Sequence, residues 1–353
     1  MKKRDEGVND SYLTKLSPRI IPYSKYNDVL DRLSKDLFSN IIELVERAEL
    51  YIPKLREILP ITPLTNELIG LRVAAVDAGS NGKDLIIGYQ PISIAVGASF
   101  EDGVKIRDPL LATLKPPSSS LDDEEGVKLS SMIGYYLMYN LASILLERCD
   151  LILIDGPLFL PKSYYAPRGR SYSSSYLEVY EATLRSLSSL LKEAEASGKY
   201  VLGVVKRIRS HYISQWLGID GLSDSLISSL LIKEGEALGP IPISGGWEEV
   251  ASYLGDARKF RPWAIFLRRG RAPIRLDLPE YSVDKAYALA SYIYSISEPS
   301  TGLPMPILAV DRLSKVTDEQ SSLIYRMVLR EARRRGISSE KLALFSIQRG
   351  END

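Results

Sequence analysis

The distribution of apolar and polar positions predicts a chain of alternating helices and strands. Apolar residues recur at helical spacing from Asn27 to Val45, which indicates a long amphipathic helix that packs on the core or contacts a second subunit. The short apolar run 73–76 indicates a buried strand, and residues 78–82 have the composition of a tight turn. Two further runs, 85–89 and 91–98, complete a predicted antiparallel meander of three strands.

The middle of the chain has the pattern of a parallel crossover. An apolar helical pattern over 127–146 precedes a short apolar run, 151–154. A helix is then expected around 177–191 and a strand over 201–205. Strand, helix and strand in succession predict a right-handed parallel connection. Together with the meander, this arrangement predicts an α/β fold whose mixed sheet is flanked by helices.

The last part of the chain continues the mixed pattern. Short helices and loops are expected over 211–255, strands over 261–267 and 274–278, and a helix over 282–297. The run 306–310 is apolar and is expected to be a third buried strand that ends on an acid. Thr317 and Gln320 have the spacing of a capping box that opens a last long helix. A closing strand is expected over 342–347.

Composition and charge exclude several classes of protein. The 353 residues contain 45 basic and 45 acidic side chains, so any surface for nucleic acid has to be a local patch. A single cysteine, Cys149, excludes an internal disulfide framework, and a single histidine, His211, excludes a metal site with several histidines. The sequence has no signal-peptide pattern and no uninterrupted apolar span, which predicts a soluble cytoplasmic protein without a membrane segment.

Three acids carry the candidate chemistry. Asp77, Asp155 and Asp311 each follow directly after a short apolar run. One such residue alone is usually a cap of its own turn. Three carboxylates that meet would repel one another unless a divalent cation held them, and hard oxygen ligands suit manganese or magnesium. With Lys206 to offset the charge of a phosphate, the expected reaction is metal-assisted phosphodiester hydrolysis, with a pair of metals.

Basic and aromatic residues interleave close to two of these positions. The first group is Tyr164, Tyr165, Arg168 and Arg170, and the second, after the strand 201–205, is Arg207 and Arg209. Such residues can stack on bases and contact phosphates. Tyrosine-rich loops are also common at protein interfaces, and a basic strand end is often only a solvated one. Both interpretations stay open on composition alone.

Five segments in this order resemble the successive motifs of the NurA nuclease family. They are VAAVDAGS from Val73, LILIDGPL from Leu151, VLGVVKRIRS from Val201, IRLDLPE from Ile274 and GLPMPILAVDRLSKVT from Gly302. The resemblance covers residues 70–330 and implies a ribonuclease H-like core and manganese-dependent degradation of DNA. It also implies a homodimer and a hexameric HerA helicase as partner in the resection of DNA ends during archaeal homologous recombination and repair.

By position, the resemblance implies that Asp77, Asp155 and Asp311 are metal ligands and that Lys206 contacts phosphate. It also implies an N-terminal helical segment over 1–70 and a nuclease domain over 71–353. Family members usually carry a glutamate about five helical turns before the second motif, where this chain has Gly134-Tyr135-Tyr136. The first motif is DAGS instead of DGS. Glu147 and Glu178 are candidates to replace the missing acid.

The missing acid leaves a second hypothesis, a NurA-like paralogue that binds DNA or HerA without efficient hydrolysis. A third is a ribonuclease H-like protein of another kind, such as a kinase-like or resolvase-like protein. Manganese bound among the three aspartates would favour the nuclease. Salt-sensitive DNA binding without turnover would favour the binding protein.

Overall fold

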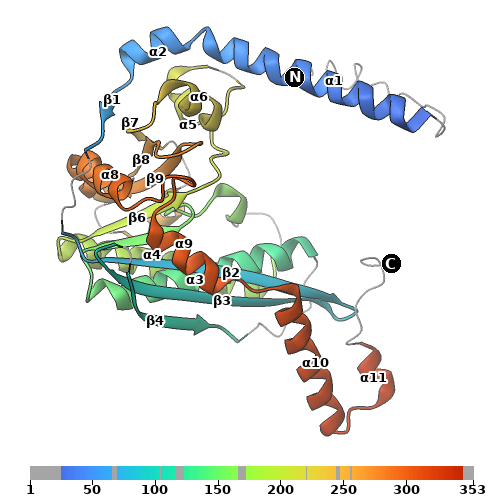
Figure 1. Ribbon diagram of the computed structural model, residues 1–353. Coiled ribbons are helices and arrows are strands. Elements are labelled where there is room, and N and C mark those ends of the chain that lie inside the picture. The colour runs from blue at the N-terminus through green and yellow to red at the C-terminus, as the bar shows by residue number, and fades with distance from the viewer. Residues whose placement is uncertain are drawn as a thin grey trace, which may run out of the picture. The chain divides into compact units, whose positions relative to one another are not determined.

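The computed structural model describes residues 25–65, 70–103, 105–115, 123–165, 172–219, 221–243, 247–254 and 257–344. The chain divides into two compact units, Met1–Tyr51 and Ile52–Asp353. In the first unit, helix α1 (Tyr26–Glu49) is the long amphipathic helix that the apolar spacing predicts (Figure 1). The second unit contains the sheet and all three candidate acids.

The second unit is built on a mixed sheet of nine strands in the order β1-β7-β8-β9-β6-β5-β2-β3-β4. In chain order the strands are β1 (Ile61–Pro63), β2 (Val73–Leu85), β3 (Gly88–Glu101), β4 (Lys105–Thr113), β5 (Leu151–Asp155), β6 (Tyr200–Val205), β7 (Glu236–Pro242), β8 (Pro262–Leu267) and β9 (Ile274–Pro279). β2, β5 and β6 are parallel, and the other neighbouring pairs are antiparallel. The predicted α/β class with a mixed sheet is therefore confirmed, and β4-β3-β2-β5-β6 is the ribonuclease H-like core.

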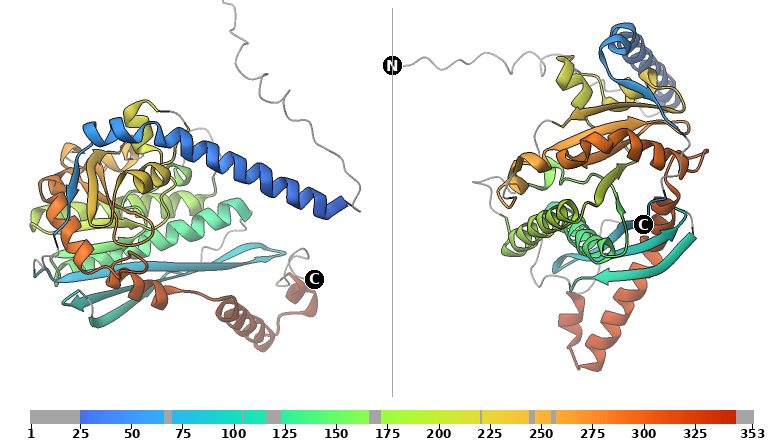
Figure 2. Two further views of the ribbon diagram at one scale, coloured as in Figure 1. Left: turned by 45° about the horizontal axis from the view of Figure 1, so that its top comes forward. Right: turned by 90° about the vertical axis from the view of Figure 1, so that its left-hand side faces the viewer.

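Helices cover both faces of this sheet (Figure 2). The remaining helices of the second unit are α2 (Ile52–Ile58), α3 (Asp123–Leu146), α4 (Ser174–Ala196), α5 (Tyr212–Leu217), α6 (Asp224–Leu231), α7 (Glu248–Ala251), α8 (Ala286–Ser295), α9 (Met305–Ser314), α10 (Asp318–Arg334) and α11 (Ser339–Ala343), with short 3-10 turns at Lys162–Tyr164, Ala257–Phe260 and Glu280–Lys285. α3 and α4 pack on one face, and α8 and α9 pack on the other.

Alternate residues of the central strands supply the two halves of the core, because successive side chains of a strand point to opposite faces. Ala74 and Val76 of β2 pack under α3, whereas Val73 and Ala75 pack under α8 and α9. A sheet covered on both faces needs continuous apolar strands, which is the pattern that 73–76, 151–154 and 201–205 show.

Helix α3 is apolar along most of its length. Its segment Glu124–Leu146 is long and apolar enough to cross a membrane, but 72% of its most apolar window is buried inside the protein. Its contacts with β2, β3 and α4 are those of a central core helix.

The predicted turn at 78–82 is wrong, because β2 continues to Leu85 and pairs with β3 along its whole length. The small residues serve close packing instead of chain reversal. A Cβ on Gly79 would lie 2.0 Å from the Ser314 carbonyl oxygen, and one on Gly82 would lie 2.2 Å from the Tyr89 ring. The predicted strands 85–89 and 91–98 are therefore largely one strand, β3, and the third strand of the meander is β4.

The strand expected at 306–310 is also wrong, because these residues lie in helix α9. Ile307 and Val310, three residues apart, are both fully buried, as on one face of a helix. A short apolar run does not distinguish a buried strand from a buried helix. β7 lies in the stretch expected to hold only short helices and loops, and α11 occupies part of the expected closing strand, whose residues 345–347 lie outside the described residues.

Candidate metal centre

Asp77 and Asp155 flank a point where the sheet opens. The parallel pairing of β2 with β5 runs from Val73 opposite Leu151 to Val76 opposite Ile154 and stops there. Beyond it, β2 stays paired with β3 and β5 with β6. Parallel strands have their carboxyl ends at the same edge of a sheet. The two carboxylates therefore lie at the same end of β2 and β5, where these strands stop pairing.

The alternation of strand residues also decides which face they share. Val73 and Ala75 pack on the α8 and α9 face, so Asp77, two residues further on, belongs to that face. On β5, Asp155 follows Leu151 and Leu153 at the same two-residue spacing. On β6 and just beyond it, Lys206 follows Leu202 and Val204 in the same way, so both side chains belong to this face. Helix α9 covers this face and carries Asp311.

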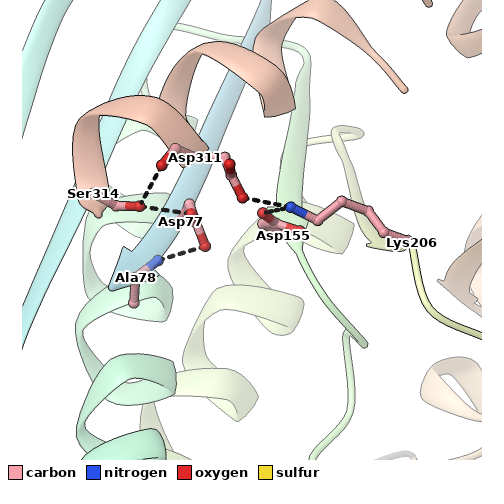
Figure 3. Close-up of polar contacts among 6 residues, drawn as sticks. All are labelled: Asp77, Ala78, Asp155, Lys206, Asp311 and Ser314. Carbon is pink, nitrogen blue, oxygen red and sulfur yellow. Dashed lines mark hydrogen bonds and ion pairs between the residues drawn. The ribbon is translucent and has the colours of Figure 1, made fainter. Parts of the chain in front are cut away.

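The three acids converge on one point. One carboxylate oxygen from each of Asp77, Asp155 and Asp311 lies within 4.8 Å of the other two. Lys206 Nζ donates to Asp155 Oδ2 at 2.7 Å and to Asp311 Oδ1 at 2.6 Å, so its ammonium lies between them (Figure 3). Oxygen ligands of one octahedral ion are at most about 4.2 Å apart, so the spacing of these three carboxylate oxygens is close to that of a set of metal ligands. The carboxylates therefore fit a manganese or magnesium ion.

Asp77 is held in place by the protein itself. The backbone N–H of Ala78 donates to its Oδ1 at 2.7 Å, and the Ser314 hydroxyl donates to its Oδ2 at 2.6 Å (Figure 3). Ser314 follows Asp311 by three residues on α9, so one helical turn delivers both the acid and the hydroxyl. The missing side chain of Gly79 lets the Ser314 backbone approach β2 this closely.

Burial makes the negative charge of this cluster costly. Burial raises the pKa of Asp77, against the hydrogen bonds from Ser314 and Ala78. Burial and the neighbouring Asp77 raise the pKa of Asp155 to about 7, against Lys206. Burial alone would lower the pKa of Lys206, but its hydrogen bonds to Asp155 and Asp311 outweigh this and raise it. The raised pKa values of Asp77 and Asp155 indicate that Lys206 alone does not offset the burial and mutual repulsion of the carboxylates.

Helix α3 forms the other wall of the site. A cavity of about 190 Å³ is lined by Asp77 and Asp155 together with Ser131, Gly134, Tyr135 and Met138 of α3 and Tyr164. Gly134-Tyr135, where the family resemblance leads one to expect a glutamate, thus faces the carboxylates. Glu147 lies beyond the end of α3, at the opposite end of β5, and Glu178 lines a different cavity with Tyr136 and Lys115. Neither supplies the missing acid.

The predicted DNA contacts are distributed unevenly around the site. Tyr164 lines the cavity, and its ring meets that of Tyr135 edge to face at 6.0 Å. Tyr165 is turned to the core, where its ring lies 6.4 Å from Tyr180. Arg207 directly follows Lys206 in a bend, Arg209 comes two residues later, and both arginines are exposed. Arg168 and Arg170 lie outside the described residues.

A buried ion pair, which the apolar pattern of the sequence did not predict, supports the loop after Asp155. Arg275 Nε donates to Asp277 Oδ1 at 2.6 Å, and the Leu158 N–H donates to Asp277 Oδ2 at 3.3 Å. Both residues lie on β9, which pairs with β6 just before Lys206. Their alternation in the motif IRLDLPE, with opposite charges two residues apart on one face of a strand, was the available signal. Ser314 has no comparable signal in the sequence, because the apolar run before it predicts a strand and not a helix.

The fold and the site define an α/β protein with a carboxylate cluster at the end of its central parallel strands. The family model of the NurA domain matches residues 71–316, well over half of the chain. The chain therefore belongs to the NurA family, as its sequence motifs predict. A comparison with curated proteins gives no match.

Three solved structures similar to this chain are NurA proteins. The NurA nuclease from Sulfolobus solfataricus is 17% identical, with a TM-score of 0.63, over 87% of this chain and 98% of that one. NurA with manganese is 12% identical, with a TM-score of 0.56, over 85% and 97% of the two chains. NurA bound to dAMP and manganese is 12% identical, with a TM-score of 0.57, over 90% and 99%. At these identities, the likeness shows a shared fold.

Proposed function

We propose that this protein is a metal-dependent deoxyribonuclease that uses manganese, with magnesium as the other candidate, to hydrolyse phosphodiester bonds in DNA. The observation that carries the proposal is the convergence of Asp77, Asp155 and Asp311 from two strands and a distant helix. Membership of the NurA family and the presence of manganese and dAMP in similar NurA structures support it.

In this proposal the three aspartates hold the cation. When bound, a divalent cation lowers the pKa of a water and offsets charge on the phosphate. The Ala78 N–H and the Ser314 hydroxyl keep Asp77 oriented. Lys206, only partly buried, offers its ammonium to the phosphate from between Asp155 and Asp311.

The surrounding residues would bind the strand. Tyr164, at the cavity wall, can stack on a base, and Arg207 and Arg209 can contact phosphates. We assign phosphate contacts to Arg168 and Arg170 as well, which precede α4, whereas the ring of Tyr165 packs on the core. The nuclease domain would extend over 71–353, after an N-terminal helical segment, 1–70.

Degradation of end-labelled single- and double-stranded DNA with manganese, magnesium or a chelator tests the activity. We expect metal-dependent loss of the label that Asp77→Ala and Asp155→Ala both abolish. Intact DNA under every condition, with binding preserved, would overturn the proposal.

That result would favour the second candidate, a NurA-like protein that binds DNA or a HerA helicase without cleaving. The observation in its favour is the wall formed by Gly134 and Tyr135, which places no carboxylate opposite Asp77 and Asp155. Asp77, Asp155, Asp311 and Lys206 favour the nuclease.

We further propose that the protein acts in the cytoplasm as a homodimer with a hexameric HerA-type helicase. Its role would be the resection of DNA ends in recombinational repair. This proposal rests on family membership alone. Light scattering after size exclusion should give the mass of a dimer, and purified HerA-type helicase should co-elute with the protein. A monomer that does not bind the helicase would contradict it.

A further inference from the structure

The formal charges of the site do not balance. Asp77, Asp155 and Asp311 bring three negative charges, and Lys206 brings one positive charge, which leaves two. Lys206 bonds to Asp155 and Asp311 but not to Asp77, whose oxygens accept from Ala78 and Ser314 instead. One divalent cation would complete the neutralisation of this cluster.

The opposite wall of the cavity offers nothing anionic. Ser131, Gly134, Tyr135 and Met138 recur at the spacing of one helical face and line the cavity from α3, and none carries a charge. Two-metal sites hold their ions about 3.5–4 Å apart, so each ion needs carboxylate oxygens on its own side. Here the Lys206 ammonium already occupies Asp155 Oδ2 and Asp311 Oδ1, where a second ion would need its ligands. Among the residues that the structure describes, the three aspartates are the only group of acids with this convergence.

We propose that this chain holds one divalent cation at the three aspartates, not two, and that the Lys206 ammonium supplies the second positive charge. The proposal rests on the function proposed above. Lys206 lies where it contacts two of the three carboxylates, so it neutralises the site from the side away from Asp77 (Figure 3). A fixed ammonium offsets charge on a phosphate as a metal does, without needing carboxylate ligands of its own.

The number of manganese ions bound per chain tests the single-cation proposal directly. Metal-free, full-length protein is titrated with manganese and followed by calorimetry and by electron paramagnetic resonance. We expect one manganese per chain with the spectrum of an isolated ion. Two ions per chain with a magnetically coupled spectrum would overturn the single-cation proposal and leave the nuclease proposal intact. No binding would overturn both.

Substitutions at Ser131 examine the α3 wall. Gly134 is unsuitable, because a Cβ there would lie 3.2 Å from the Ala78 side chain. Ser131 lines the same cavity one turn earlier, so Ser131→Glu adds the missing charge with less crowding. We expect Ser131→Glu to bind a second manganese and the neutral Ser131→Gln to bind one. One manganese in both variants would overturn the inference that the uncharged α3 wall limits the site to one ion.

Lys206→Met removes the ammonium and keeps the length of the side chain. Because the ammonium opposes a cation at the same carboxylates, we expect manganese to bind at least about tenfold more tightly, while DNA cleavage falls. Lys206→Arg keeps the charge and should keep the affinity near that of the wild type. Unchanged affinity in Lys206→Met would overturn the assignment of Lys206 as the second positive charge.

Discussion

Two charged clusters lie near each other in the second unit, and they differ in balance. Arg275 and Asp277 form a pair of one positive and one negative side chain, only 6% and 2% exposed. Around Lys206, three carboxylates face one ammonium, and the Asp311 side chain is 49% exposed. The two charges of the buried pair balance each other, whereas the carboxylates of the open cluster outnumber its one ammonium and need a cation or a proton to balance them. The first arrangement supports a structure, and the second favours binding.

Burial raises the pKa of an aspartate in each cluster, but the neighbouring groups act differently. Burial raises the pKa of Asp277, but Arg275 and the Leu158 N–H oppose the shift. Burial also raises the pKa of Asp155, and there the neighbouring Asp77 adds to the shift. An excess of buried carboxylates over positive groups costs stability in the absence of a ligand and is common at functional sites.

The largest expected effect comes from breaking the balanced pair. Asp277→Ala leaves the Arg275 guanidinium buried without its partner, which should lower the free energy of unfolding by about 3–5 kcal/mol. Urea denaturation measures this loss. Asp150→Ala is the matched control, because it breaks the exposed pair with Arg72 and should cost much less. Equal losses in the two variants would contradict a supporting role for the buried pair.

The unbalanced cluster should respond in the opposite way. Asp155→Asn removes a buried charge that repels Asp77, so the metal-free variant should melt at a higher temperature than the wild type at neutral pH. Its DNA cleavage should fall by roughly 10²–10⁴, because several kcal/mol of metal-dependent stabilisation are lost. Thermal denaturation and a cleavage assay measure both effects. A variant that is inactive and also less stable would show that Asp155 is structural.

The pH dependence of the stability should also reveal the carboxylate cluster. The pKa of Asp155 is about 7 in the folded protein, against a usual 3.8. Its protonated form therefore stabilises the fold fully below about pH 4, and this contribution is lost as the pH rises through 7. The metal-free protein should become less stable over that interval.

The stabilisation of the protein by manganese should instead increase with pH, because manganese binds the deprotonated carboxylates. The rise in melting temperature that it causes should grow as the pH increases from about 5 to 8. Asp155→Asn should flatten both trends. An equal effect of manganese at both ends of this range would argue against Asp155 as a ligand.

The smallest effect is expected outside both clusters, at the start of α10. The Thr317 hydroxyl accepts from the Gln320 N–H, and Gln320 Oε1 accepts from the Thr317 N–H. Thr317→Ala should lower the free energy of unfolding by about 1 kcal/mol, while Thr317→Ser should lower it less. Manganese affinity should not change in either variant. A change would mean that the cap also positions Ser314 and Asp77.

The sequence determined the elements whose pattern depends on local chemistry. The apolar runs of β5, β6 and β8 identify buried strands, since a strand covered on both faces has no polar side. The helix opened by Thr317 follows from a capping box that involves only neighbours in the chain. The three acids and Lys206 were found by the same means, as polar residues that end apolar runs.

Only the tertiary structure decided how these elements meet. Gly79 and Gly82 have the composition of a turn, yet they lie in a strand. Ser314 approaches Gly79 from a distant part of the chain, and Tyr89 approaches Gly82 from the neighbouring strand β3. Asp311 lies on a helix and reaches Asp77 because α9 packs across β2. The hydrogen bond from Ser314 to Asp77 and that from the Leu158 N–H to Asp277 also depend on packing. A local pattern indicates what each residue can do, and long-range contacts select its neighbours.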